Sequence, residues 1–468
     1  MRPARTRRYR AALMAAACAL GVACQSGPGA AKPSVPLPDA FRGAATATAT
    51  AASLADVKWW DLFEDDQLQA LLRRAVAEND DIRLAAARVQ QAQAGVGIAR
   101  SSQFPSVGAD AQAGAQRTPT AGSSEARSAA AIALRGRAAW ELDFWGRYRR
   151  ETEAAQARLL STEWVRREVM SGLVSRVAEG YFSLRALDLE LDVAQRALAS
   201  RRESLGLARI REQGGATSLV DVRQAEQLVY SAAATIVDLE GRIAQQENFL
   251  SMLAGGLPGA ITRGRDLTAQ PHAPEVPAGL PSDLLARRPD VQSAEQNLVA
   301  ADAEIGVARA AYFPSITLTG SGGVQSTALA ALFSAGAGAW SAVAGLAQPI
   351  FTAGRTRSQV ALAEARRTEA GIGYERTVKG AFRDVSDALV GYRTSREFRA
   401  QQEQLVAAAE DGRRLADIRY RGGATSYLEV LDAETRLLNA QLALVNARLS
   451  ELTGFVELYR SLGGGWQG

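Results

Sequence analysis

Closely spaced carboxylates are the groups in this sequence best suited to chemistry. Glu141 and Asp143 lie in the segment WELDF, and Glu429, Asp432 and Glu434 lie in LEVLDAE. Paired carboxylates are what most glycoside hydrolases use. Here, however, the acids fall within repeated patterns of helices and strands, with no glycine-rich phosphate loop or cluster of metal ligands beside them. We therefore expect a protein that is not an enzyme.

Histidine and cysteine are scarce. The chain of 468 residues has one histidine, His272, and two cysteines, Cys18 and Cys24. This excludes most metal sites, a disulfide framework, and any Ser-His-Asp or Cys-His arrangement not built on His272. His272 lies among prolines in QPHAPEVP, which is typical of a loop. We expect no metal and no cofactor.

The first residues account for the basic character of the chain. The net charge is +4, yet residues 1–23 carry five arginines and no acid, so the remainder is close to neutral. We therefore expect no nucleic-acid partner. An arginine-rich start followed by a short apolar run over residues 11–23 predicts a secretory signal peptide, because a spanning helix needs about 20 apolar residues.

Cys24 directly follows this leader in the segment LGVAC. Small residues before a cysteine resemble the lipobox of bacterial lipoproteins, although Gly21 replaces the usual leucine. The resemblance implies that Cys24 becomes a lipidated N-terminus. The alternative is an ordinary cleaved signal with an incidental cysteine. Residues 25–57 are rich in Ala, Pro, Gly and Thr, which is typical of an extended linker.

The rest of the chain consists of two related halves. Residues 207–226, LARIREQGGATSLVDVRQAE, match residues 415–434, LADIRYRGGATSYLEVLDAE, at twelve of twenty positions. Residues 80–107 and 289–316 form a second collinear pair, and both end in the motif FPS followed by an aliphatic residue. Similarity at a fixed offset is the mark of a repeated architecture. The chain is therefore one duplicated architecture and not a string of unrelated domains.

Each half is expected to begin with a helix that carries a coiled-coil seam. Its apolar positions recur every seven residues, a spacing that predicts helices packed along one stripe. A proline follows Phe104 and Phe313 and ends these helices. The seam residues are Leu68, Ala75, Ile82, Val89 and Val96 in the first half, and Val291, Leu298 and Ile305 in the second.

A strand hairpin follows in each half, over 104–144 and 314–351. In 131–144 the even positions are apolar and several odd positions are charged, which predicts a strand with two unlike faces. Strands of about ten residues with this alternation are typical of a transmembrane β-barrel, and a sheet packed on a soluble core shows the same pattern. We expect polar loops at 117–128 and 325–338.

Very long helices complete each half. We predict helices over about 147–213 and 218–253, and again over about 354–421 and 426–462, with a GGATS segment between the members of each pair. Sixty-odd helical residues span about 100 Å. Hairpins of this length form tubes, stalks or coiled-coil spacers.

Four strands cannot close a barrel. An open strand edge in lipid leaves backbone groups unpaired, and single-chain outer-membrane barrels have eight or more strands. Either the strands stay out of the membrane, or several chains share one barrel. Three chains give twelve strands above a helical tube.

The chain resembles the outer membrane factor family (TolC/OprM-like) over nearly its whole mature length. The matching segments are WWDLF with LQALL (59–72), ENDDIRLAAARVQQAQA (78–94), WELDFWGR (140–147), AQPIFTAGRTR (347–357) and the stretch 420–466. With the lipobox-like cysteine, it looks most like the lipoprotein, NodT-type branch that serves RND efflux systems.

The resemblance implies a mainly α fold with a β-barrel part. Three chains share a 12-stranded outer-membrane barrel, which a long α-helical barrel continues through the periplasm of a Gram-negative bacterium. The implied function is passive export of substrate delivered by an inner-membrane RND-type pump through a periplasmic adaptor protein. The corresponding segments are a signal peptide at 1–23, a lipidated linker at 24–57, a first repeat at 58–257, an equatorial linker at 258–288 and a second repeat at 289–468.

The resemblance also places the site residues at the GGATS turns. Gly214, Gly215, Gly422 and Gly423 are the implied periplasmic tips that contact the adaptor. Family members narrow the pore with acids near the second tip, and Glu429 and Asp432 occupy those positions, three residues apart on one helix face. Asp221 and Tyr420 match an acid and a tyrosine that help hold the channel shut. The alternative for each acid is an ordinary solvated charge on the protein surface.

Two other functions compete with the efflux channel. One is the outer-membrane conduit of a type I protein secretion system, because members of this family also serve there. The other is a structural coiled-coil stalk, which does not explain the four strands with two unlike faces. The sequence leaves the substrate open.

Overall fold

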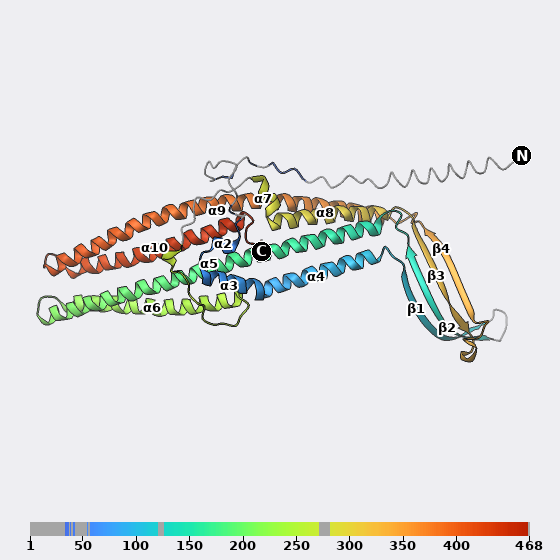
Figure 1. Ribbon diagram of the computed structural model, residues 1–468, viewed down its shortest axis with the longest axis horizontal. Coiled ribbons are helices and arrows are strands. Elements are labelled where there is room, and N and C mark those ends of the chain that lie inside the picture. Colours follow the sequence, from blue (N-terminus) through green and yellow to red (C-terminus); the bar gives the residue numbers. More distant parts are fainter. Residues whose placement is uncertain are drawn as a thin grey trace. The chain divides into compact units, whose positions relative to one another are not determined.

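The computed structural model describes residues 33–36, 38, 41–42, 54, 57–119, 126–270 and 281–466 (Figure 1). The predicted signal peptide, Cys24 and His272 lie outside the described residues. The elements in chain order are α2 (Trp59–Leu62), α3 (Asp66–Glu78), α4 (Asp80–Ser101), β1 (Ser106–Pro119), β2 (Ala126–Glu141), α5 (Arg147–Gln213), α6 (Leu219–Leu253), η2 (Leu267–Ala269), α7 (Pro281–Arg287), α8 (Pro289–Ala310), β3 (Ser315–Ser326), η3 (Leu329–Ala331), β4 (Gly338–Ala347), α9 (Arg355–Arg421) and α10 (Tyr427–Ser461).

The chain forms two compact units, and each unit takes corresponding segments from both halves of the repeat. One unit contains Arg88–Thr162 and Ser293–Glu375, which include all four strands. The other contains Val35–Ala87, Glu163–Gln292 and Arg376–Gly468, which include the GGATS turns. The duplication therefore does not divide the chain into two separate globules.

The four strands form a single antiparallel sheet in the order β1-β2-β3-β4 (Figure 1). The register places the alternating patterns in phase. Leu134 of β2 pairs with Ala111 of β1 and Val324 of β3, and Trp140 pairs with Leu318. Side chains at alternate positions share a face. One face is therefore mainly apolar, with Arg117 and Ser326 in phase with it near the strand ends, and the other carries most of the polar residues.

The first hairpin loop differs from the expected one, and the second lies close to its predicted range. The first is shorter, because the ladder continues to the pair between Pro119 and Ala126 and satisfies backbone groups well beyond residue 117. The second runs from the end of β3 at Ser326 to Gly338 and contains the short helix η3. The predicted range of 117–128 for the first loop is thus wrong.

The long helices have equal lengths in the two halves. α5 and α9 have 67 residues each, and α6 and α10 have 35 each. At 1.5 Å per residue, α5 and α9 each span about 100 Å. Over the described residues, no helix combines the length and apolarity needed to cross a membrane.

The first seam is divided between two helices, where one helix was predicted. α3 ends before Asn79, and α4 begins after it. The Asn79 side chain accepts hydrogen bonds from the backbone N–H groups of Asp81 and Ile82, and it donates one to the carbonyl of Leu253. Asparagine favours such helix boundaries because its short side chain substitutes for a missing backbone partner. The buried residues Leu68 and Val89 still follow the predicted seam.

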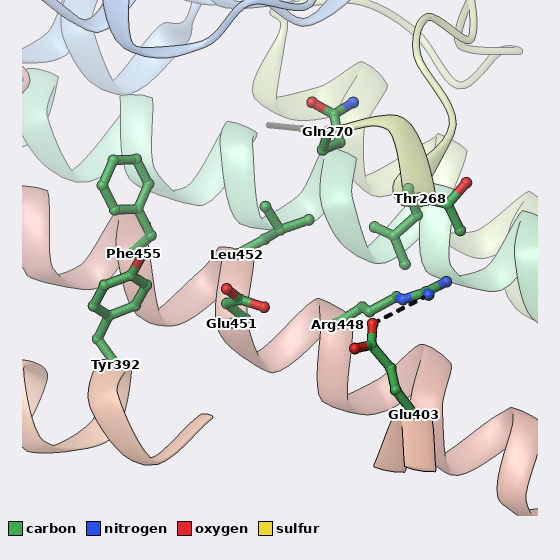
Figure 2. Close-up of a pocket in the computed structure, with 9 residues that line it drawn as sticks. Thr268, Gln270, Tyr392, Glu403, Arg448, Glu451, Leu452 and Phe455 are labelled. Carbon is green, nitrogen blue, oxygen red and sulfur yellow. Dashed lines mark hydrogen bonds and ion pairs between the residues drawn. The ribbon is translucent and has the colours of Figure 1, made fainter. Parts of the chain in front are cut away.

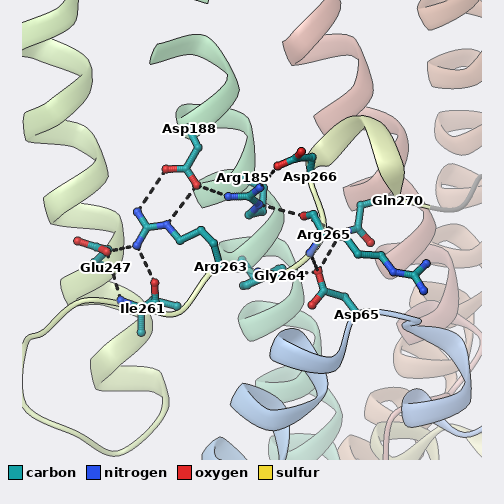
Figure 3. Close-up of polar contacts among 11 residues, drawn as sticks. Asp65, Arg185, Asp188, Glu247, Ile261, Arg263, Gly264, Arg265, Asp266 and Gln270 are labelled. Carbon is teal, nitrogen blue, oxygen red and sulfur yellow. Dashed lines mark hydrogen bonds and ion pairs between the residues drawn. The ribbon is translucent and has the colours of Figure 1, made fainter. Parts of the chain in front are cut away.

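A polar network fastens the segment after α6 to the rest of its unit (Figure 3). Asp65 is buried, and its carboxylate accepts hydrogen bonds from the Tyr181 hydroxyl, the Arg265 backbone N–H and the Gln270 amide. The same carboxylate caps α3 through the N–H groups of Gln67 and Leu68. Several donors around one carboxylate offset the cost of burying its charge. Asp65 thereby joins three segments that are far apart in the sequence.

Candidate functional site

The two GGATS turns have the same backbone structure. In the first turn, the N–H of Gly214 binds the carbonyl of Ile210 and the N–H of Ala216 binds that of Arg211. The second turn repeats both bonds with Gly422 and Ala424. Gly215 and Gly423 each have a φ of 74°, a left-handed conformation that glycine adopts without strain. All four predicted tip glycines are exposed.

Asp221 caps the helix that leaves the first turn. Its carboxylate accepts hydrogen bonds from the Thr217 hydroxyl and from the backbone N–H and hydroxyl of Ser218. The hydrogen bond from Thr217, with those from Ser218, lowers the pKa of Asp221. An acid in the first turn of a helix also interacts favourably with the helix dipole. Asp221 is therefore a structural cap in this chain.

Glu429 occupies the equivalent position in the second turn. It accepts a hydrogen bond from the Thr425 hydroxyl and forms an ion pair of 3.2 Å with Arg419. Asp432, one turn further along α10, is exposed and pairs with Arg436 at 2.8 Å. An exposed i,i+4 pair holds its partners weakly. Of the three predicted acids, Asp432 is thus the one least committed to the fold.

Tyr420 lies in the buried junction between the two helical hairpins. Its ring is 5.2 Å from that of Tyr427, and the Arg211 guanidinium lies 4.3 Å from its centroid. The hydroxyl is buried, and it makes no hydrogen bond within the described part of the chain. No bond between Tyr420 and Asp221 occurs among these residues. The gate that pairs these two residues remains a prediction.

Apolar residues from all four long helices surround Tyr420. The helices join in one buried cluster near the turns, and this cluster fixes the two hairpins against each other. Its members are Leu198, Leu205, Ala208, Val222, Ala225, Val229, Ala232, Ala416, Tyr420, Tyr427, Val430 and Leu431.

Glu434 is a buried acid at this junction that we did not single out as a site residue. One carboxylate oxygen accepts from the hydroxyls of Ser200 and Ser204 on α5, and the other has no partner among the described residues. Burial raises the pKa of Glu434. Burial and the nearby Glu434 together raise the pKa of Tyr427 to about 12. The position of Glu434 in the sequence is the signal for its burial, because Glu434 follows Tyr427 by seven residues on the apolar stripe of α10.

Glu226, the acid at the equivalent position of the first half, lies in an environment that lowers its pKa. Glu226 pairs with Arg209 and Arg223 at 2.9 and 2.6 Å, and these hydrogen bonds lower its pKa. At the fixed offset, the residues in place of these arginines are Asp417 and Leu431. The second half therefore provides no ion pair of this kind to its acid among the described residues. The guanidinium groups of Arg201, which is buried on α5, and of Arg413 on α9 act on Glu434 electrostatically and oppose the rise in its pKa.

The carboxylates considered for catalysis also have structural partners. Asp143 accepts from the backbone N–H groups of Tyr148 and Arg149 and so caps α5, and Glu141 lies 3.8 Å from Arg147. The described residues contain no group of three or more potential metal ligands.

A cavity of about 50 Å³ lies between η2 and the helices α9 and α10 (Figure 2). Arg448 faces Glu403 across it at 3.5 Å, and Glu451 pairs with Arg399. A space of this size holds a few water molecules, and drug-sized ligands need several hundred Å³. The charges that line the cavity also compensate one another. This cavity therefore serves the packing of the helices.

Duplicated long helical hairpins and a four-stranded antiparallel sheet with a mainly apolar face are typical of a channel protein of the outer membrane. The sequence matches the family model for outer membrane efflux proteins over residues 71–256 and 280–464. The chain belongs to this family. It is an outer-membrane component of an efflux system and extends into the periplasm.

The relatives and solved structures that follow match this chain over most of its length and of their own. The chain is 39% identical to the probable efflux pump outer membrane protein TtgC of Pseudomonas putida, over 88% of this chain and 86% of that protein. It is 32% identical to the cation efflux system protein CusC of Escherichia coli, over 94% and 96%. The open state of the Neisseria gonorrhoeae MtrE outer membrane channel matches with a TM-score of 0.85 at 30% identity, over 94% and 98% of the two chains. The predicted family and fold class are confirmed.

Glu434→Gln should stabilise the protein at neutral pH. The raised pKa of Glu434 means that its contribution to stability is fully present below the unfolded-state pKa and is lost as the pH rises through the folded-state pKa. A glutamine keeps the neutral form at every pH. We expect a higher Tm than wild type at pH 8 and equal values near pH 4, measured by circular dichroism of the purified protein.

Glu226→Gln is the matched control, because it changes the equivalent residue of the other half. The lowered pKa of Glu226 gives stability that is present above the unfolded-state pKa and is lost as the pH falls. This variant should be less stable than wild type at pH 8 and equal to it in acid. Shifts of the same sign in both variants would contradict the assignment.

Proposed function

We propose that three copies of this chain close one barrel and form a continuous export tube. The observation that carries the proposal is the open four-stranded sheet, whose outer strands β1 and β4 each leave one edge unpaired among the described residues. In lipid an unpaired edge costs several kcal/mol per backbone group, so a membrane sheet must close. Three copies joined from β4 to β1 give twelve strands, an even number that suits an antiparallel barrel.

In this assembly the helical hairpins of the three chains continue the tube into the periplasm. The turns with Gly214, Gly215, Gly422 and Gly423 form its end and contact the periplasmic adaptor. Asp432 and Glu429 from three chains form acidic rings that narrow the pore and favour cations. Tyr420 and Asp221 lie beside these rings and contribute to closure.

The partners follow from the position of the tube. An inner-membrane RND-type pump supplies energy and substrate, and the adaptor connects the pump to the tube, so this chain performs no catalytic step and needs no cofactor. TtgC is named as part of an efflux pump and CusC as part of a cation efflux system. The similarity to them supports export of small molecules or cations over protein secretion.

The same proposal includes a covalent lipid on Cys24. The segment LGVAC ends the arginine-rich leader, and Gln25 follows the cysteine. Acyl chains at the N-terminus add a second attachment to the outer membrane beside the barrel.

The mass of the purified mature protein in detergent tests the shared barrel directly. We expect light scattering to give the mass of three chains, and single-channel recordings in a planar bilayer to show conductance. A monomeric mass together with an absence of conductance would refute the shared barrel and favour the stalk.

Asp432→Ala should increase the single-channel conductance and reduce the cation preference, because it removes one acidic ring from the narrow end. The control is Asp192→Ala. Asp192 has the same kind of exposed i,i+4 partner, Arg196 at 2.9 Å, but lies far from the turns along α5. An equal effect of both substitutions would show that Asp432 is an ordinary surface acid.

Cys24→Ser should abolish incorporation of radiolabelled palmitate in growing cells, because the thiol is the acceptor of the lipid. The control is Cys18→Ser, which changes the other cysteine within the leader and should leave labelling intact. Labelling that persists in the Cys24 variant would show that the leader is an ordinary cleaved signal.

A further inference from the structure

Charged residues are distributed unevenly over the sheet. β1 and β2 carry all of them, and β3 and β4 contain no Asp, Glu, Lys or Arg. Asp110, Arg135 and Arg137 lie at the middle of the paired region, in two neighbouring rows of the register. Their positions alternate with those of Ala109, Gly136 and Ala138, so all three belong to the polar face. This face is the lumen side if the apolar face contacts lipid.

Two of the three charges neutralise each other. The Arg137 guanidinium binds the Asp110 carboxylate across β1 and β2, with Nε to Oδ1 at 2.6 Å and Nη2 to Oδ2 at 3.2 Å. Nη2 donates a charge-assisted hydrogen bond to Oδ2, and Nε lies within ion-pair distance of Oδ1, which accepts no hydrogen bond among the described residues. Asp110 is therefore committed to Arg137.

Arg135 keeps its charge. It lies opposite Asp110 in the register, but its guanidinium extends to the other side and donates to the side-chain oxygen of Gln325 on β3. No acid lies within ion-pair distance of Arg135 among the described residues. The amide of Gln325 satisfies one N–H group without cancelling the positive charge.

Gly323, the residue beside Arg135 on β3, explains why the Arg135 guanidinium extends towards Gln325. Gly323 pairs with Arg135, and a Cβ built on Gly323 would lie 2.1 Å from the carbonyl oxygen of Leu134. Only glycine allows β3 to approach β2 so closely at this point. The absence of a side chain also leaves a path along which Arg135 reaches Gln325.

We propose that Arg135 is a specificity-determining residue of the channel and forms a basic belt inside the barrel. The inference rests on the proposed shared barrel, in which three copies of Arg135 face one lumen. One acid and two arginines leave one net positive charge per chain at this level. The belt favours anions and anionic groups of a passing substrate, opposite in sign to the acidic rings proposed at the periplasmic end.

The size of the effect follows from Coulomb's law in water. A unit charge about 10 Å from a passing ion changes the local ion concentration about twofold at low salt. The Debye length is about 10 Å at 0.1 M salt and about 3 Å at 1 M, so the belt acts on ions in dilute salt only. This salt dependence separates a charge effect from a change in pore width.

The test is the reversal potential of single channels in a dilute KCl gradient, with the full mature protein in a planar bilayer. Arg135→Gln should raise the cation-to-anion permeability ratio about twofold relative to wild type, and the difference should vanish near 1 M salt. Arg135→Lys keeps the charge and should behave as wild type. Equal permeability ratios for wild type and Arg135→Gln in dilute salt would overturn the proposal.

Two further substitutions in the same sheet test the sign of the charge effect on the cation-to-anion permeability ratio. Asp110→Asn releases the charge of Arg137 and should move the ratio towards anions. Arg117→Gln removes an equal charge from β1 at a position in phase with the apolar face, and it should leave the ratio unchanged. An Arg117→Gln shift as large as that of Arg135→Gln would also overturn the proposal.

These outcomes are distinct from failure of the shared barrel. If the wild-type protein were a monomer without conductance, the proposed assembly itself would be wrong. If wild type and variants were trimers with normal conductance but equal selectivity, the barrel would stand and the basic belt would not.

Discussion

The unpaired edges of the sheet are the constraint on which the remaining structure depends. β1 and β4 form the two edges of a sheet with one apolar face, and no further strand occurs among the described residues to cover them. In water an edge of this kind promotes aggregation, and in lipid it cannot persist. Closure by other copies requires the long helices of each chain to run alongside those of its neighbours. The equal lengths of α5 and α9, and of α6 and α10, suit such a ring, because the two halves of each chain contribute helical hairpins of matching length.

Most of the fold was predictable because its signals are long and regular. The segment Arg147–Gln213 contains no proline, and the alternation in 131–144 extends over many residues, so neighbouring positions reinforce one another. Features that involve only a few residues were harder to predict from the sequence. The helix boundary at Asn79 depends on a hydrogen bond to Leu253, which is remote in the sequence. The true end of β1 depends on pairing with β2, and the alternation within β1 alone does not show it.

The site was predicted less completely, because similar segments in the two halves meet different neighbours. Asp221 and Glu429 are equivalent acids, and both turn back to a threonine at the start of their helix. Their type and spacing do not distinguish a cap from a gate. Glu226 and Glu434 differ more: one is held by two arginines, and the other lies buried beside two serines of α5. The difference arises from tertiary packing, since Ser200 and Ser204 are more than 200 residues away from Glu434.

The duplicated halves allow one architecture to carry different charges in the sheet and near the GGATS turns. Near the turns, the second half carries Glu429 and Asp432 where the first carries Asp221 and Gln224. In the sheet the asymmetry is reversed, because the strands of the first half carry the arginines and those of the second half carry no charge. Gly323 is central to this difference, since its missing side chain admits both the close approach of β2 and the passage of Arg135. Pairing of two strand backbones requires only that the side chains of each strand leave room for the other strand. The repeat can therefore preserve its fold while each half carries different charges.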